Sequence, residues 1–116
     1  MVKLKKKWKD KWVKALRSGE YEQGIGQLKE SAYTTFSGKP EYCCLGVLCD
    51  VTGVRFKGTS AEPPHKVADL VFTKKSLAAN PPVEDWKVGV YAKLAKFNDE
   101  NMWTFKRIAN WIEKNL

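Results

Sequence analysis

The stretch YCCLGVLCDV, residues 42–51, is the longest nearly uninterrupted apolar run in the chain, and it lies near the middle. Ten residues are too few to cross a bilayer, so the run is expected to be a buried core segment. Its apolar residues recur at helical spacing, and Gly53 follows as a stop signal. We therefore predict a central helix over residues 43–52. Inside it, Gly46 lowers helix propensity by about 1 kcal/mol relative to alanine, which indicates that another element packs closely there.

The composition around this run is that of one globular domain. The chain has 116 residues, of which 43% are hydrophobic and 12% aromatic. No run is long enough for a membrane span, and no apolar signal region follows the basic start, so a cytoplasmic protein is expected. Three cysteines, two of them adjacent, do not fit a disulfide framework.

Positive charge is concentrated at the start of the chain. The formal net charge is +8, and residues 1–17 hold eight lysines and arginines against Asp10, which makes +7. A tryptophan and leucine stripe in this segment predicts an amphipathic basic helix within residues 1–19. Its apolar face either packs on the core or forms a surface for nucleic acid, an acidic protein or anionic lipid. The candidate basic surface consists of Lys5, Lys6, Lys9 and Arg17.

Residues 20–42 carry turn and strand signals. A strand near 24–29 is expected to pair with one near 31–36 or 41–43 in a small antiparallel sheet. Two closely spaced glycines at its start can bring a backbone close to a phosphate, although turn or bulge glycines explain the same pattern. The candidate ligand-binding residues are Tyr21, Gln23, Gly24, Gly26 and Lys29.

The second half of the chain divides into an irregular middle and a helical end. Residues 54–89 show no sustained periodicity and are a candidate binding loop region. Residues 90–116 are expected to form two helices, the second capped by Thr104 and carrying a core-facing stripe. Trp103 and Trp111 either complete the core or form a dimer patch.

No arrangement of residues indicates catalysis or metal binding. The three cysteines and the single His65 lack the spacing of a zinc site, and buried structural thiols are the expected state. A nucleophile at Cys43 or Cys44 with His65 as its base stays open as an alternative. No catalytic residue, metal ligand or cofactor is predicted.

Three blocks of the sequence resemble a family of small proteins encoded by tailed bacteriophages and prophages. The first is WVKALRSGEYEQG at residues 12–24, and the second is YCCLGVLCD at residues 42–50. The third combines Leu94 and Asn98-Asp99 with TFKRIA at residues 104–109. The middle third and the lysine-rich start depart from the family pattern.

The resemblance implies a phage accessory protein that acts inside the infected bacterial cell. It brings no catalytic residues, and it favours a non-enzymatic protein that binds a host factor, above all an inhibitor of antiviral defence. Such an inhibitor would mask a protein surface or sequester a nucleotide-type immune signal. A nucleic-acid-binding protein that uses the basic helix is the first alternative, and a small cysteine-dependent enzyme is the second. The expected fold is a single α+β domain with a basic N-terminal helix, a small sheet, a buried cysteine-rich helix and a C-terminal helix pair.

Overall fold

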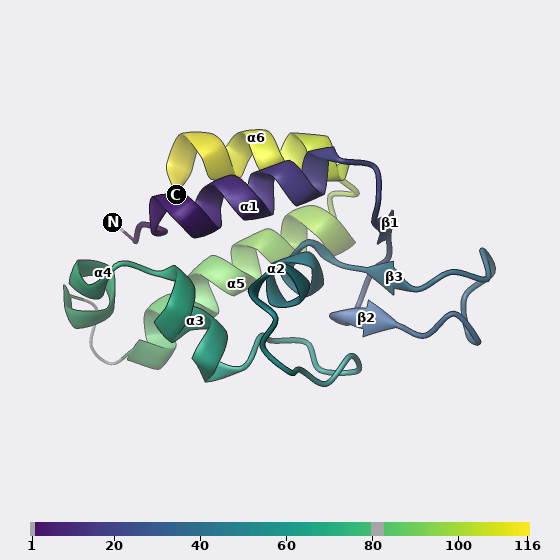
Figure 1. The fold of residues 1–116 in the computed structure, drawn as a ribbon, viewed down its shortest axis with the longest axis horizontal. Coiled ribbons are helices and arrows are strands. Elements are labelled where there is room, and N and C mark those ends of the chain that lie inside the picture. The colour runs from purple at the N-terminus through teal and green to yellow at the C-terminus, as the bar shows by residue number, and fades with distance from the viewer. Residues whose placement is uncertain (1, 80–82) are drawn as a thin grey trace.

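The computed structural model describes residues 2–79 and 83–116 and shows an α+β domain elongated along one axis, with extents of 42 × 26 × 25 Å (Figure 1). The described residues form six helices and three short strands, in the order α1 (Lys6–Arg17), β1 (Glu22–Gln23), β2 (Lys29–Glu30), β3 (Glu41–Tyr42), α2 (Cys44–Thr52), α3 (His65–Val71), α4 (Lys74–Ala79), α5 (Val83–Asp99) and α6 (Phe105–Asn115). Among the described residues, no helix is both long enough and apolar enough to cross a bilayer.

The predicted central helix is confirmed as α2. Its residues from Cys44 to Cys49 are all buried, and it packs against α1, α3 and α5. Gly46 faces Leu28, the residue directly before β2. A Cβ built on Gly46 would overlap the carbonyl oxygen of Leu28 and lie 2.7 Å from its carbonyl carbon. The expected close approach at Gly46 is therefore made by the backbone at Leu28.

The sheet is mixed, in the strand order β1-β3-β2. β2 pairs with β3 in the antiparallel direction, as expected, with Lys29 opposite Tyr42. β1 instead pairs with β3 in parallel, with Gln23 opposite Tyr42, so the expectation of a purely antiparallel sheet is wrong at this strand. β1 and β2 therefore run in opposite directions on the two sides of β3.

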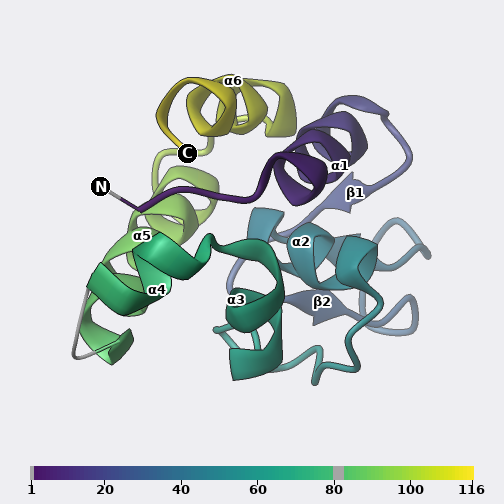
Figure 2. The ribbon, with the colours of Figure 1, turned by 60° about the vertical axis from the view of Figure 1, so that its left-hand side comes forward.

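Helices α1 and α6 lie side by side over α2 and α5 (Figures 1 and 2). In α1 the residues Trp12, Val13 and Leu16 are buried, and the indole Nε1 of Trp12 donates to the backbone oxygen of Cys44 at 2.9 Å. The tryptophan stripe is thus a core face. In α6 the predicted cap is present, because the Thr104 hydroxyl accepts from the backbone N–H of Arg107.

The region predicted to be irregular, residues 54–89, is more helical than expected. It holds α3 and α4, and α5 begins at Val83 rather than near residue 90. α3 starts directly after Pro64, whose backbone (φ −59°, ψ 154°) lies outside the helical region, so Pro64 is the N-cap of the helix. Short runs such as 67–72 have too little periodicity to distinguish helix from strand, which explains the difference.

Candidate functional site

The five residues predicted to bind a ligand fall into two groups. Tyr21, Gln23 and Gly24 make contacts within the protein, whereas Gly26 and Lys29 line an open groove. The Tyr21 hydroxyl donates to Asp50 Oδ2 at 2.5 Å and its ring packs edge-on against Tyr42. Burial, together with this hydrogen bond, raises the pKa of Tyr21, so the side chain stays protonated and fixed.

Gln23 belongs to a hydrogen-bonded network centred on Asn98. Its Nε2 donates to Asn98 Oδ1 at 2.9 Å and to the Trp103 carbonyl at 2.8 Å, and its Oε1 accepts from the Phe105 N–H. Both amide hydrogens of Gln23 are therefore used within the protein. Gly24 lies in the same network, because its carbonyl accepts from Asn98 Nδ2 at 2.8 Å. A Cβ at Gly24 would meet that of Glu41 at 2.8 Å, so the glycine permits this close packing.

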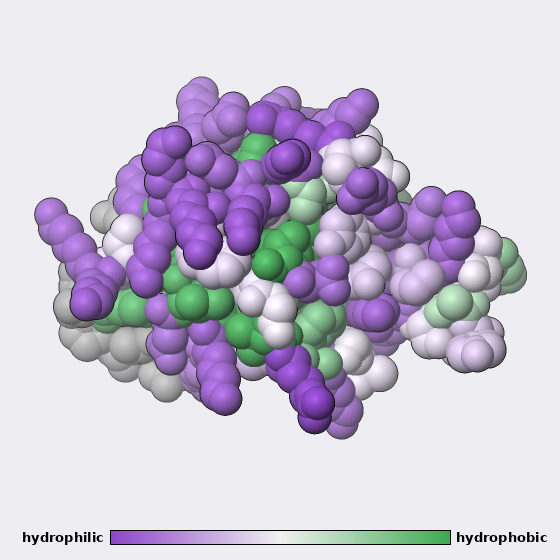
Figure 3. All heavy atoms as spheres, in the orientation of Figure 1, coloured by the Kyte–Doolittle hydropathy of each residue, from purple (hydrophilic) through white to green (hydrophobic). Residues whose placement is uncertain are grey.

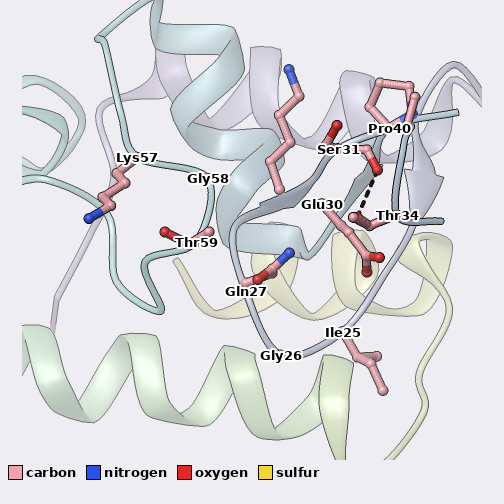
Figure 4. A pocket seen from close by; sticks show the side chains of 12 residues that line it. Ile25, Gly26, Gln27, Glu30, Ser31, Thr34, Pro40, Lys57, Gly58 and Thr59 are labelled. Carbon is pink, nitrogen blue, oxygen red and sulfur yellow. Dashed lines mark hydrogen bonds between the residues drawn. The ribbon is translucent and has the colours of Figure 1, made fainter.

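The groove has a volume of about 1060 Å³ and lies between the segment around Gly26 and the turn at Gly58 (Figure 4). Its lining mixes cations, a carboxylate and hydroxyls, among them Lys29, Glu30, Thr34 and Lys57. The Lys29 ammonium lies 5.3 Å from the centre of the Tyr42 ring, whose electrons attract it. The groove is therefore open and of mixed charge.

The loop between β2 and β3, residues 31–40, extends from one end of the molecule (Figure 1) and presents two bare aromatic rings. Tyr33 is 99% exposed and Phe36 is 110% exposed, so neither ring rests on the protein. Greenish residues at the right-hand tip of Figure 3 mark this loop on an otherwise polar rim. We name Tyr33 and Phe36 with their loop the aromatic loop. The sequence showed these rings only as strand-forming residues, and nothing in the local pattern indicated that they would be exposed.

Hydrogen bonds within the aromatic loop fix its shape. The Thr34 N–H donates to the Ser31 carbonyl at 3.0 Å, which closes a turn that contains Tyr33. On the other side, the Thr35 hydroxyl donates to the Lys39 carbonyl at 2.8 Å and the Ser37 hydroxyl donates to Glu41 Oε2 at 3.2 Å. The rings are therefore carried on an ordered support.

The predicted basic surface of Lys5, Lys6, Lys9 and Arg17 is not one free patch. Arg17 bonds to both carboxylate oxygens of Glu113, at 3.1 and 3.2 Å, and to Asn110. The hydrogen bonds between the two side chains raise the pKa of Arg17 and lower the pKa of Glu113. Lys6 pairs with Asp10 at 3.3 Å, while Lys5 and Lys9 are half-buried.

The three cysteines are buried and belong to the core around α2. Burial raises the pKa of the Cys43 thiol, raises that of Cys44 well above its ordinary value, and raises that of Cys49 to about 12. Protonated, enclosed thiols are poor nucleophiles, so this geometry does not favour the cysteine-dependent enzyme. Within the described part of the chain, no three acidic, cysteine or histidine side chains gather as a metal site.

Trp103 and Trp111 pack on Phe97. The rings of Phe97 and Trp103 stack with centres 4.0 Å apart, and the Arg107 guanidinium lies 4.0 Å from the centre of the Trp103 ring. Trp111 meets Phe97 edge-on at 5.2 Å. Both indoles are half-buried and pack against the core, which is the first of the two alternatives predicted for them.

Comparison with protein families identifies the class of this domain. The family model of a domain of unknown function, DUF8296, matches residues 4–89, and the chain belongs to this family. The match extends from the segment before α1 into α5 and therefore includes α2 and the whole sheet. No curated protein and no solved structure matches the chain.

Proposed function

We propose that this protein acts by binding a protein partner through the aromatic loop, and not by catalysis. The observation that carries the proposal is the full exposure of Tyr33 and Phe36 on a loop fixed by its own hydrogen bonds. Large aromatic side chains dominate the energy of protein interfaces, and an ordered loop loses little conformational entropy when it binds.

The charges around the rings favour a protein over nucleic acid as the partner. Near them, Lys39 lies 4.0 Å from Glu22, and Glu41 accepts from Ser37. The loop thus lacks the excess of cations that a phosphate backbone requires. The groove at the base of the aromatic loop is lined in part by Ala32, Pro40 and the half-exposed Ile25. These residues extend the apolar contact area.

The resemblance to small proteins of tailed bacteriophages supports a host protein of antiviral defence as the class of partner. In this proposal the protein works in the cytoplasm of the infected cell and inhibits its target by covering a surface. The rings would fill apolar pockets of the target, and the polar rim of the loop would surround them.

The test is the double variant Tyr33→Ser, Phe36→Ser. Partners are first captured from phage-infected cells, and each is then purified so that its dissociation constant can be measured with the wild type and the variant. We expect the double variant to bind about 30-fold more weakly or worse, since each aromatic anchor contributes about 1 kcal/mol or more. In a cell that carries the targeted defence, the variant should no longer restore plaque formation.

The matched control is Met102→Ser, which removes another exposed apolar side chain, one that is 68% exposed and lies between α5 and α6. This variant should bind like the wild type. If the double variant keeps full affinity and full protection of the phage, the aromatic loop is not the binding surface.

Sequestration of a nucleotide signal is the competing outcome. Calorimetry with cyclic dinucleotides and linear nucleotides tests it directly, because Lys29 and Lys57 line the groove. Measurable heat that disappears in Lys29→Gln, and not in the double aromatic variant, would replace protein masking by sequestration.

A further inference from the structure

A row of three lysines runs along the exposed side of α1. Lys7, Lys11 and Lys14 are spaced by four and then three residues, which places them on one face of the helix, and all three are exposed. Among the described residues, none of the three is paired with a carboxylate, in contrast to Lys6 and Arg17 on the neighbouring face. We name these three side chains the lysine ridge. Hydrophilic side chains cover this part of the molecule in Figure 3.

Trp8 holds two of the three ammonium groups in place. The Nζ atoms of Lys7 and Lys11 each lie 5.0 Å from the centre of its ring, so each is attracted by the ring electrons. The indole is half-buried and packs against the core, which fixes the ring relative to α1. Both ammonium groups are therefore held beside the same fixed ring.

Three exposed lysines on one helix face suit an anionic partner with several charges. A membrane is disfavoured because the apolar face of α1, with Trp12 and Leu16, is buried in the core and has nothing to insert into lipid. An acidic protein is less suited than nucleic acid, because the ridge offers no exposed apolar centre, and protein interfaces are built around one. A phosphate backbone needs only cations at its surface.

We propose that the lysine ridge binds the phosphate backbone of nucleic acid without reading its sequence. The ridge and the aromatic loop share no residue, so this proposal stands or falls independently of the proposed function. Three lysines neutralise up to three phosphates, which gives the interaction a characteristic dependence on salt.

The experiment measures fluorescence anisotropy of a labelled 20-base-pair duplex of mixed sequence, with the full chain, over a series of salt concentrations. The logarithm of the binding constant should fall with the logarithm of salt with a slope of about −2.7 or steeper, since each phosphate contact contributes about −0.9. In the variant Lys7→Gln, Lys11→Gln, Lys14→Gln the slope should flatten by about 2.7, and each single substitution should flatten it by about 0.9.

The control is Lys66→Gln, Lys75→Gln, Lys96→Gln, which removes the same charge from three exposed lysines outside α1. It should leave affinity and slope close to the wild type. Three outcomes overturn the proposal: no binding of the wild type at 20 mM salt, equal weakening in both triple variants, or tighter binding to polyglutamate or to phosphatidylserine vesicles than to the duplex.

A second variant separates the charges from their support. Trp8→Leu keeps all three lysines but removes the ring, so the salt slope should stay unchanged while affinity falls about two- to fivefold. Because Trp8 also packs on the core, circular dichroism must first show that the variant is folded at the assay temperature. A folded Trp8→Leu variant with wild-type affinity would show that the ring does not position the ridge.

Discussion

Asn98 joins three parts of the chain that are distant in sequence. Its side chain is 1% exposed, and Oδ1 accepts from Gln23 Nε2 and from the Cys44 N–H, while Nδ2 donates to the Gly24 carbonyl and to Asp99. One amide thus satisfies groups of the β1 segment, the start of α2 and the end of α5. Buried polar groups that lose such partners destabilise the fold by about 1–3 kcal/mol each.

Replacement of Asn98 by Ala should therefore lower the free energy of unfolding by about 2–4 kcal/mol, because Gln23 and the Gly24 carbonyl lose their partner in the interior. Urea denaturation followed by circular dichroism measures the change. Asn101→Ala is the control, since this exposed residue lies just beyond α5 and should change stability by less than about 0.5 kcal/mol. Equal stability of the two variants would show that the Asn98 network does not stabilise the fold.

Cys49 makes stability depend on alkaline pH. Burial raises its pKa from 9.0 to about 12, so in the fold the thiol stays protonated where the unfolded chain already ionises. The protonated thiol makes its full contribution to the free energy of unfolding below about pH 9. As pH rises from there toward the pKa in the fold, the free energy of unfolding falls by about 1.4 kcal/mol per pH unit. Urea denaturation at pH 8 to 10.5 should show a shallower decline for Cys49→Ala than for the wild type. Parallel declines would mean that Cys49 does not titrate between these limits.

At the scale of elements, α2 packs directly on the backbone of Leu28, because Gly46 has no side chain to keep them apart. The Leu28 carbonyl also accepts from the Cys43 N–H at 3.3 Å, directly before α2 begins. The helix therefore approaches the sheet segment closely enough that no Cβ fits between them. In this helix the local preference against glycine is outweighed by packing.

Gly46→Ala should destabilise the protein by about 1–3 kcal/mol or more, although alanine is the better helix former, because the methyl group forces α2 away from Leu28. The same substitution at Gly89 in α5 is the matched control, since a Cβ there meets nothing within 4 Å. Gly89→Ala should stabilise the protein by about 0.5–1 kcal/mol. Thermal unfolding of both variants checks the opposite signs, and a stabilised Gly46→Ala variant would contradict the close packing.

For the whole molecule, α6 completes a core that the family match, residues 4–89, covers only in part. Phe105, Ile108 and Ile112 are buried against the rest of the domain, and α6 makes its largest contact with α1. The C-terminal helix is therefore a structural part of this chain and not an appendage.

We expect Ile108→Ala and Ile112→Ala to cost about 2–5 kcal/mol each, because each leaves a cavity in a fully buried site. Lys106→Ala and Lys114→Ala, on the exposed side of the same helix, should change stability by less than about 0.5 kcal/mol each. Denaturation midpoints of the four variants provide the comparison. Small effects at both isoleucines would show that α6 packs loosely on α1.

Sequence patterns predicted the elements whose periodicity is long or whose signals are local. The central helix, the core face of α1 at Trp12 and the Thr104 cap belong to this class, because a 3.6-residue period or a single hydroxyl defines them. The Gln23–Asn98 bond joins residues 75 positions apart, and the parallel pairing of β1 depends on where the chain turns. Neither feature produces a pattern in a short stretch of sequence.

The candidate sites show the same limit. The charge of the first helix was evident, but the sequence could not show that Arg17 meets Glu113 or that Lys7 and Lys11 meet Trp8. The lysines that the sequence predicted as a basic surface therefore differ from those of the lysine ridge. The exposure of Tyr33 and Phe36 likewise depends on the projection of a loop, which only the fold determines.

The Leu4 N–H donates to the Leu116 carbonyl at 3.1 Å, so the two ends of the described chain meet at one pole of the long axis, and the aromatic loop lies at the other (Figure 1). A linker joined to either end leaves the molecule away from Tyr33 and Phe36. Tethered to a sensor surface or fused to a carrier, the domain points the same tip outward whichever end is used. Amino- and carboxyl-terminal fusions should therefore be equally able to reach a partner, and the choice between them can be made on expression alone.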